Sequence, residues 1–176
     1  EEYSFTVTSS RTLTANFVIN TYTVEVVANP AEGGEVNGGG EYQHGENVTV
    51  TAIENEGYTF QNWTENGEEL STDLSYSFEV FTSRSLQANF EIDTYYIYVS
   101  ANPAEGGSVT GEGEYEFGET VVVEAIANEG YVFQNWTENE EVVSSETLYS
   151  FEATATRNLS ANFELNVFEI TLSANP

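Results

Sequence analysis

Apolar and polar residues alternate with a period of two along much of this chain. The clearest apolar series are Val24, Val26 and Ala28, then Val48, Val50 and Ala52, then Leu86, Ala88 and Phe90. A period of two is typical of β-strands with one buried face, whereas an amphipathic helix repeats its apolar positions every 3.6 residues. These runs are rich in Val, Thr, Tyr and Phe, which strands favour. The pattern predicts small all-β domains.

Turn-forming residues separate the alternating runs. They include Glu32-Gly33-Gly34, Gly38-Gly39-Gly40, Glu56-Gly57 and Asn66-Gly67. The last pair is a strong signal for a two-residue hairpin. We expect five or six short strands in one unit, at about 21–29, 34–37, 46–54, 57–64, 74–80 and 85–92. No segment predicts an amphipathic helix, and a short helical turn near 70–75 stays open.

An internal repeat organises the whole sequence. Ala-Asn-Pro-Ala-Glu-Gly-Gly occurs at 28–34 and 101–107, and Gln-Asn-Trp-Thr-Glu-Asn occurs at 61–66 and 134–139. Aligned without a gap, residues 20–92 and 93–165 are identical at 44 of 73 positions. Self-similarity at a fixed period is the signature of a repeat protein. The sequence therefore predicts tandem β domains in a linear array.

The repeat divides the chain into four segments. Residues 1–19 match the C-terminal part of a repeat, 20–92 and 93–165 are full repeats, and 166–176 match the start of another. Pro30, Pro103 and Pro176 keep the same step of 73 residues. Because the segments begin and end within a repeat, we expect this chain to be an excerpt from a longer array.

The junction between the two full repeats contains no linker. The apolar series that ends at Ile92 and the series that begins at Tyr95 have opposite parity. Since a shift of one residue turns a strand's side chains to the other face, the chain is expected to change partners at Asp93-Thr94. No Gly, Pro or Ser linker intervenes. A short junction of this kind favours a stiff rod over a flexible string of domains.

The net charge of −27 excludes several classes of function. There are 30 acidic residues, three arginines and no lysine. Such a surface repels nucleic acid and anionic lipid. The absence of cysteine excludes disulfides and cysteine metal sites, and no run is long enough for a transmembrane helix. We expect no nucleic-acid partner and no membrane insertion in this segment. Weak association with divalent cations or glycans stays open.

Four motifs together resemble a known family. They are Ala-Asn-Pro-Ala-Glu-Gly-Gly, Gly-Glu-x-Val-x-Val-x-Ala, Glu-Gly-Tyr-x-Phe-x-Asn-Trp and Arg-x-Leu-x-Ala-Asn-Phe. In this order they resemble the divergent internalin-type (InlB) B-repeat of bacterial and archaeal surface proteins. The resemblance covers the whole chain and implies many tandem copies, a compact β fold related to the β-grasp and no catalytic residues. The strong acidity departs from the family and suggests a saline or ion-rich habitat rather than a changed fold.

No residue predicts enzymatic chemistry. The single histidine, His44, corresponds to Phe117 in the next repeat and has no companion ligands for a zinc site. The many glutamates supply carboxylate pairs by chance, but solvated faces and protected edge strands explain them better. We therefore predict that the protein is not an enzyme and has no catalytic, cofactor-binding or metal-binding residue.

The repeated aromatic and basic residues favour structural roles. Trp63 and Trp136 could stack on sugar rings, but their strand pattern favours the core, together with Tyr58, Phe60, Phe78, Phe90 and their equivalents. The arginines occupy one repeat position, as Arg11, Arg84 and Arg157. A cation repeated once per unit is expected to form a charge-assisted bond to a carboxylate of its own unit or of a neighbouring one.

Four sites match the acceptor pattern for N-glycosylation. They begin at Asn47, Asn62, Asn135 and Asn158. The pattern is short and often arises by chance, so modification of these residues stays open.

These observations favour a structural extracellular segment, a rigid stalk, shaft or filament on a microbial cell surface. An adhesin that recognises glycan or protein ligands is the alternative, and an enzyme accessory domain is a third. The expected partners are neighbouring repeats of the same chain and, in a fibre, identical chains.

Overall fold

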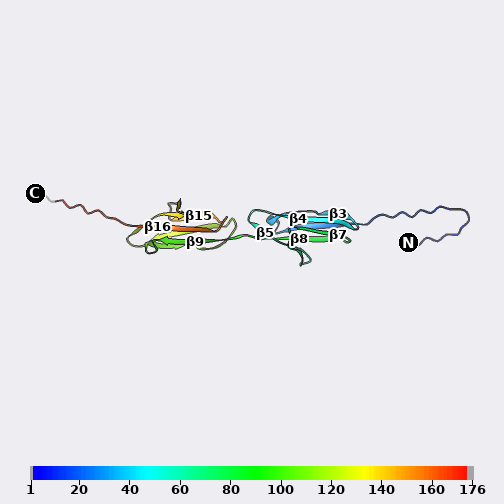
Figure 1. Cartoon of the computed structure of the whole chain (residues 1–176), viewed down its shortest axis with the longest axis horizontal. Helices are drawn as coiled ribbons and strands as arrows, with labels where there is room; N and C mark the ends of the chain where they lie inside the picture. The colour runs from blue at the N-terminus through cyan, green and yellow to red at the C-terminus, as the bar shows by residue number, and fades with distance from the viewer. Residues whose placement is uncertain (1, 174–176) are drawn as a thin grey trace.

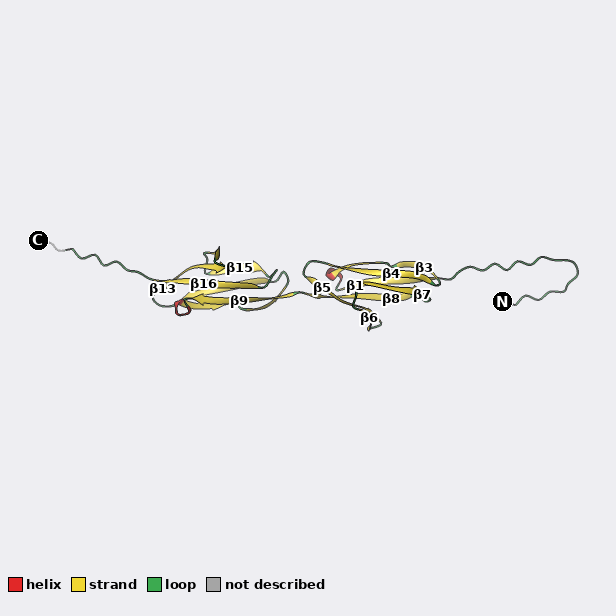
Figure 2. Ribbon diagram, viewed as in Figure 1, coloured by secondary structure: helices red, strands yellow, loops and turns green. Residues whose placement is uncertain are grey.

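Two β domains follow one another along the chain, and their ribbons lie end to end (Figure 1; Figure 2). The computed structural model describes residues 2–173; the repeated proline at position 176 lies outside them. The first domain consists of β1 (Thr21–Asn29), β2 (Gly34–Asn37), β3 (Gly40–Gln43), β4 (Glu46–Glu54), β5 (Tyr58–Glu65), β6 (Glu68–Ser71), β7 (Ser75–Val80) and β8 (Arg84–Ile92). The second consists of β9 (Thr94–Asn102), β10 (Gly107–Thr110), β11 (Gly113–Glu116), β12 (Thr120–Ala127), β13 (Tyr131–Glu138), β14 (Glu141–Ser144), β15 (Leu148–Glu152) and β16 (Arg157–Leu165). The prediction of an all-β tandem repeat is confirmed.

Each domain packs a five-stranded sheet against a three-stranded sheet. In the first domain the strand orders are β3-β1-β8-β5-β6 and β2-β4-β7, and the second domain repeats both. Alternate residues from the two sheets form one buried cluster, to which β1 contributes Val24, β4 contributes Val50 and β8 contributes Leu86. These are positions that the period-two pattern assigned to the core. β8 and β9 belong to different sheets, so the expected change of partners at Asp93 is also confirmed.

The number of strands in one repeat was predicted too low. Each domain has eight strands rather than five or six, because β3 and β6, and their equivalents β11 and β14, were not anticipated. Asn66 and Gly67 form the expected hairpin turn with φ angles of 52° and 83°, and β6 is the second strand of that hairpin. The only helical turns within residues 2–173 are two 3-10 turns, η1 (Ala31–Gly33) and η2 (Ala104–Gly106), rather than one near 70–75.

A bulge in β5 places two large aromatic rings in the core. The register between β5 and β8 shifts between Phe60 and Asn62, which leaves Gln61 exposed. In a regular strand, residues three apart face opposite sides; the extra residue of a bulge lets Phe60 and Trp63 both face inward. β13 repeats the bulge at the equivalent position, between Phe133 and Asn135.

The first and last strands of each domain are parallel neighbours. β1 pairs with β8 from Val24↔Arg84 to Asn29↔Asn89, and β9 pairs with β16 in the same way. All other strand pairs between residues 2 and 173 are antiparallel. Because β1 and β8 run in one direction, the chain enters a domain at one end and leaves it at the other.

The segments that flank the two domains, residues 2–20 and 166–173, have no regular secondary structure, and the N-terminal segment runs outward and then turns back on itself (Figure 2). The strands of a full domain that match residues 2–19 are β7 and β8, which pair with β4, β1 and β5. In the first domain those partner strands are already occupied by β7 and β8 themselves, so Phe17 and its neighbours stay exposed.

Candidate functional site

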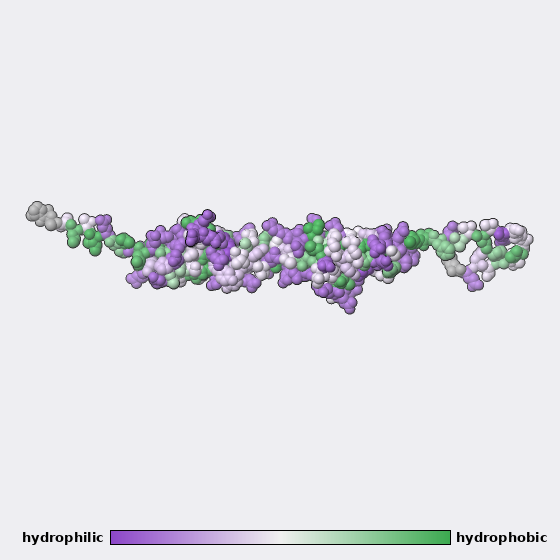
Figure 3. Space-filling model, in the orientation of Figure 1, coloured by the Kyte–Doolittle hydropathy of each residue, from purple (hydrophilic) through white to green (hydrophobic). Residues whose placement is uncertain are grey.

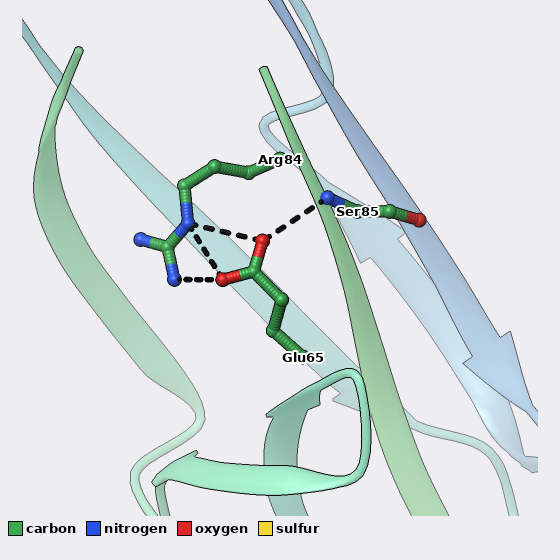
Figure 4. Close-up of polar contacts among 3 residues, drawn as sticks. All are labelled: Glu65, Arg84 and Ser85. Carbon is green, nitrogen blue, oxygen red and sulfur yellow. Dashed lines mark hydrogen bonds and ion pairs between the residues drawn. The ribbon is translucent and has the colours of Figure 1, made fainter. Parts of the chain in front are cut away.

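An arginine–glutamate ion pair joins β5 to β8 in the first domain. The guanidinium of Arg84 donates from Nη2 and Nε to Oε2 of Glu65, at 2.8 and 3.1 Å (Figure 4). The other carboxylate oxygen accepts a bond of 3.3 Å from the backbone N–H of Ser85. The second domain repeats the pair between Arg157 and Glu138, with a shortest distance of 2.6 Å. The predicted tie is therefore to a carboxylate of the same unit.

Aromatic rings cover the other side of each arginine. The guanidinium carbon of Arg84 lies 4.3 Å from the ring centre of Phe78 and 5.8 Å from that of Tyr76. Cation–π contact strengthens when the cation is partly withdrawn from water, and this side chain is mostly covered. The hydrogen bond to Glu65 raises the pKa of Arg84 above its usual range, and the same bond lowers the pKa of Glu65. Arg84 therefore connects three strands of two sheets.

Removing the carboxylate should make the first domain less stable in a pH-dependent way. We expect Glu65→Gln to cost about 1 kcal/mol near pH 7, the size typical of a well-formed, partly covered ion pair. Because the folded-state pKa of Glu65 lies below the ordinary 4.5, its contribution is complete above that value and is lost as pH falls through the folded pKa. Denaturant unfolding across this pH range measures the difference between parent and variant.

The control for this experiment is Glu68→Gln. Glu68 is exposed on β6 and takes no part in the ion pair, so the substitution removes a charge without removing the tie. A difference between Glu65→Gln and the parent that is the same at every pH would contradict the assignment.

A row of asparagines crosses the five-stranded sheet of each domain. Asn29 donates to the side-chain oxygen of Asn89 at 3.3 Å, and Asn89 donates to Asn62 at 2.8 Å and to Thr64 at 3.1 Å. Asn102, Asn162 and Asn135 repeat the row. Each asparagine comes from a different repeat motif, so the motifs meet in space although they are distant in sequence. This polar tie was not predicted.

The asparagine row gives two of the four glycosylation motifs a structural role. Asn62 accepts from Asn89 and donates to Glu69 at 2.8 Å, and Thr64 of the same motif also accepts from Asn89. The motif at Asn135 repeats the two bonds from the facing asparagine, Asn162. Asn47 and Asn158 are exposed on β4 and β16.

Both tryptophans lie in the cores, as predicted. Trp63 and Trp136 are 0% exposed and pack against Phe60 and Phe133, with ring centres 6.0 Å apart in each pair. Phe90 is also buried, whereas Tyr58 and Phe78 are half-buried. The indole N–H groups of the two tryptophans find no hydrogen-bond acceptor in the described part of the chain. Because both tryptophan rings are fully buried, stacking of either ring on a sugar is excluded in this fold.

His44 lies exposed in the turn between β3 and β4. Its ring contacts two aromatic neighbours, Tyr22 at 5.9 Å and Phe81 at 5.2 Å between ring centres. Within residues 2–173, no cluster of three or more His, Cys, Asp or Glu side chains is arranged to hold a metal ion. None of the elements described there is a helix with the length and apolar character that crossing a bilayer requires.

Exposed aromatic residues occur on the outer face of one domain. Tyr96 and Tyr98 alternate on β9, are 37% and 46% exposed, and have ring centres 4.4 Å apart. The matching residues of β1 are Thr23 and Glu25, so this pair is not repeated. Figure 3 shows that hydrophilic atoms cover most of the visible face of both domains, and that hydrophobic atoms gather along the two flanking segments.

The surface depressions are shallow and have no shared chemistry. One of about 350 Å³ beside Arg84 is lined by Thr23, Glu25, Glu65 and Ser83 among others. Another, of about 220 Å³, lies between Tyr98 and Asn158 in the second domain. Tyr98 and Asn158 correspond to Glu25 and Ser85, which line the first depression, so the two depressions overlap in repeat position but have different side chains. The polar chemistry that does repeat is structural: it ties strands together.

Comparison with known proteins identifies related sequences. Residues 22–94 and 97–167 both match the divergent InlB B-repeat domain. Two relatives come from Evansella cellulosilytica. One, whose name describes a glycine-rich membrane protein, is 29% identical over 174 residues, and these cover 93% of this chain and 18% of the relative. The other, also named as a membrane protein, is 34% identical over 140 residues. These cover 77% of this chain and 20% of that relative. This chain thus spans about a fifth of either relative.

Among solved structures, this chain is similar to the Bacillus anthracis TIE protein. The match has a TM-score of 0.42 and 12% sequence identity, and it covers 82% of this chain and 33% of that protein.

Proposed function

Because this chain belongs to the divergent InlB B-repeat domain family, we propose that it is a structural segment of a larger extracellular protein and acts as a stiff shaft on a microbial cell surface. The units of the shaft are residues 20–92 and 93–165, with 1–19 and 166–176 belonging to flanking repeats. The shaft performs no catalysis; its work is to separate other parts of the protein from the cell.

The observation that carries this proposal is the parallel pairing of the first and last strands. From Thr21 to Val24 is three residue steps, and from Arg84, the partner of Val24, to Thr94 is ten more. Thirteen steps at ~3.3 Å each advance the chain by about 40 Å from one domain to the next. Each added domain therefore lengthens the shaft by the full length of that domain.

The relatives and the surface charge support the location. Both relatives are named as membrane proteins and are about five times longer than the part that matches this chain. A segment with a net charge of −27 is repelled from anionic lipid headgroups and stays hydrated. Lateral association of identical chains into a fibre then needs salt or cations to reduce the repulsion.

Lengthening the chain tests the shaft directly. We expect that adding one and then two copies of residues 93–165 after residue 165 will increase the maximum dimension by about 40 Å for each copy, because each domain contributes about thirteen steps of strand. Small-angle X-ray scattering at moderate salt measures the dimension. Increments that shrink with each copy, as they do in a flexible string whose length grows with the square root of the number of units, would contradict the proposal.

The second candidate function is an adhesin. It is favoured by Tyr96 and Tyr98, an exposed aromatic pair beside Asn158, because aromatic faces and amides are the groups that bind sugar rings and peptides. The first domain lacks the pair and serves as the internal comparison. A shaft with one binding face reconciles both functions.

A further inference from the structure

The connection between the two domains is a single residue bonded on both sides. The backbone N–H of Asp93 donates to the carbonyl oxygen of Gly57 in the first domain at 2.8 Å, and the carbonyl of Asp93 accepts from the N–H of Phe117 in the second domain at 2.8 Å. The hydroxyl of Thr59 donates to the Asp93 carboxylate at 2.7 Å. A residue held in this way does not act as a swivel.

A side-chain contact closes the same junction. The ring of Phe117, in the turn between β11 and β12, lies against Gly57, in the turn between β4 and β5. Gly57 has a φ of +78°, and a Cβ atom added there would overlap the ring carbons of Phe117. Glycine is therefore required for two reasons: the backbone angle and the approach of the neighbouring domain's ring.

Each free end of the two-domain unit carries one half of this junction. At the far end of the second domain, the backbone N–H of Asn166 donates to the backbone carbonyl of Gly130 at 2.7 Å. Gly130 has a φ of +85°, and a Cβ atom added there would meet no atom within 4 Å. At the near end of the first domain, the backbone N–H of His44 donates to the backbone carbonyl of Asn20 at 2.9 Å. The His44 ring lies exposed against Phe81, itself 51% exposed.

We propose that the end of each domain that carries residue 44 or 117 is a docking surface for the β4–β5 type turn of the preceding B-repeat domain. This rests on the proposed shaft function and names its partner: a further domain of the same family, joined through the connector at residue 20, 93 or 166. The interface between the two domains present here is the pattern for the others. Asn20 and Asn166 already hold half of the connector's bonds, so both ends are prepared for the next domain.

The test compares two positions that contact the neighbouring domain, Gly57 and Phe117, with the two equivalent positions that do not, Gly130 and His44. Phe117→Ala and Gly57→Ala remove or block the contact, whereas His44→Ala and Gly130→Ala make the equivalent changes at positions that contact no second domain within residues 2–173. The chain has no cysteine, so Glu68→Cys and Glu141→Cys, at equivalent exposed sites on β6 and β14, accept spin labels. Electron–electron double resonance then measures the distribution of the distance between the domains.

We expect a narrow distribution in the parent and at least a twofold broader one in Phe117→Ala and Gly57→Ala. His44→Ala and Gly130→Ala should match the parent. The Gly130 variant bears the same strain of a positive φ as the Gly57 variant, so the comparison between them isolates the contact with Phe117. Circular dichroism confirms that each variant stays folded. Equal widths in all five proteins would overturn the proposal.

A lengthened chain tests the open end. When a copy of residues 93–165 is added after residue 165, Gly130 gains a following domain, and Gly130→Ala should then broaden the distance between the second and third domains as Gly57→Ala does between the first and second. If Gly130→Ala leaves the distribution of that distance unchanged, the docking proposal fails at this end. Docking and shaft fail separately: regular length increments with no effect of the docking variants would leave the shaft standing, whereas irregular increments would remove it.

Discussion

Trp136→Ala is expected to remove about 3–5 kcal/mol from the free energy of unfolding of the second domain, the usual cost of truncating a buried Trp to Ala. The ring is 0% exposed and lies in the one core cluster of its domain, against Phe133 and Phe163 among others. Small domains have only about 5–15 kcal/mol to lose. The second domain should therefore be largely unfolded under mild denaturant concentrations that leave the first domain folded.

The only two tryptophans make this experiment clean, because there is one in each domain. In Trp136→Ala, the fluorescence of Trp63 reports the first domain alone, and circular dichroism reports both. The control is Trp136→Phe. Because the indole N–H has no acceptor among the described residues, phenylalanine loses volume but breaks no hydrogen bond, and it should cost clearly less. A cost below about 1 kcal/mol for alanine would contradict the buried position.

Raising the ionic strength should increase the melting temperature by about 5–10 °C between ~0.01 M and ~1 M sodium chloride. The chain carries 30 acidic and three basic residues, and only Glu65 and Glu138 form ion pairs within residues 2–173. Most carboxylates therefore repel one another in the folded state. The Debye length falls from about 30 Å to about 3 Å over this range, and each kcal/mol gained moves the melting temperature of such a domain by about 4–8 °C.

Magnesium and choline chlorides at equal ionic strength separate screening from cation binding. If screening alone acts, choline chloride should stabilise as well as sodium chloride, and magnesium should have no special effect at millimolar concentration. A melting temperature that does not change between low and high salt would mean that bound ions or partners already compensate the carboxylates.

The sequence predicts the long strands well and misses two short strands of each repeat, for a physical reason. β1, β4 and β8 have nine residues each and show several alternations, which a helix cannot imitate. β3 and β6 have four residues each, too few to reveal a period. The β5 bulge left a trace that can be read in retrospect: Phe60 and Trp63 are three residues apart, a spacing that faces one side only if an extra residue intervenes.

The polar ties depend on register, which a single sequence does not reveal. The repeat shows that Arg84 needs a partner, but 30 acidic residues are available to it. Only the pairing of β5 with β8 brings Glu65 close. The asparagine row depends in the same way on the pairing of Asn29, Asn89 and Asn62. The contact of Phe117 with Gly57 depends on how the two domains are placed relative to each other, and a single sequence reveals this even less than it reveals strand register.

The parallel pairing of β1 and β8 also determines how a domain bears tension. A pull on the two ends of the array draws β1 and β8 in opposite directions along their common axis, so the evenly spaced hydrogen bonds from Val24 to Asn29 are loaded together in shear. An antiparallel terminal pair would be peeled apart one bond at a time. The Asn29–Asn89 bond crosses the same pair of strands and shares the load. A chain of such domains resists extension in series, and its tensile strength is that of its weakest β1–β8 pair.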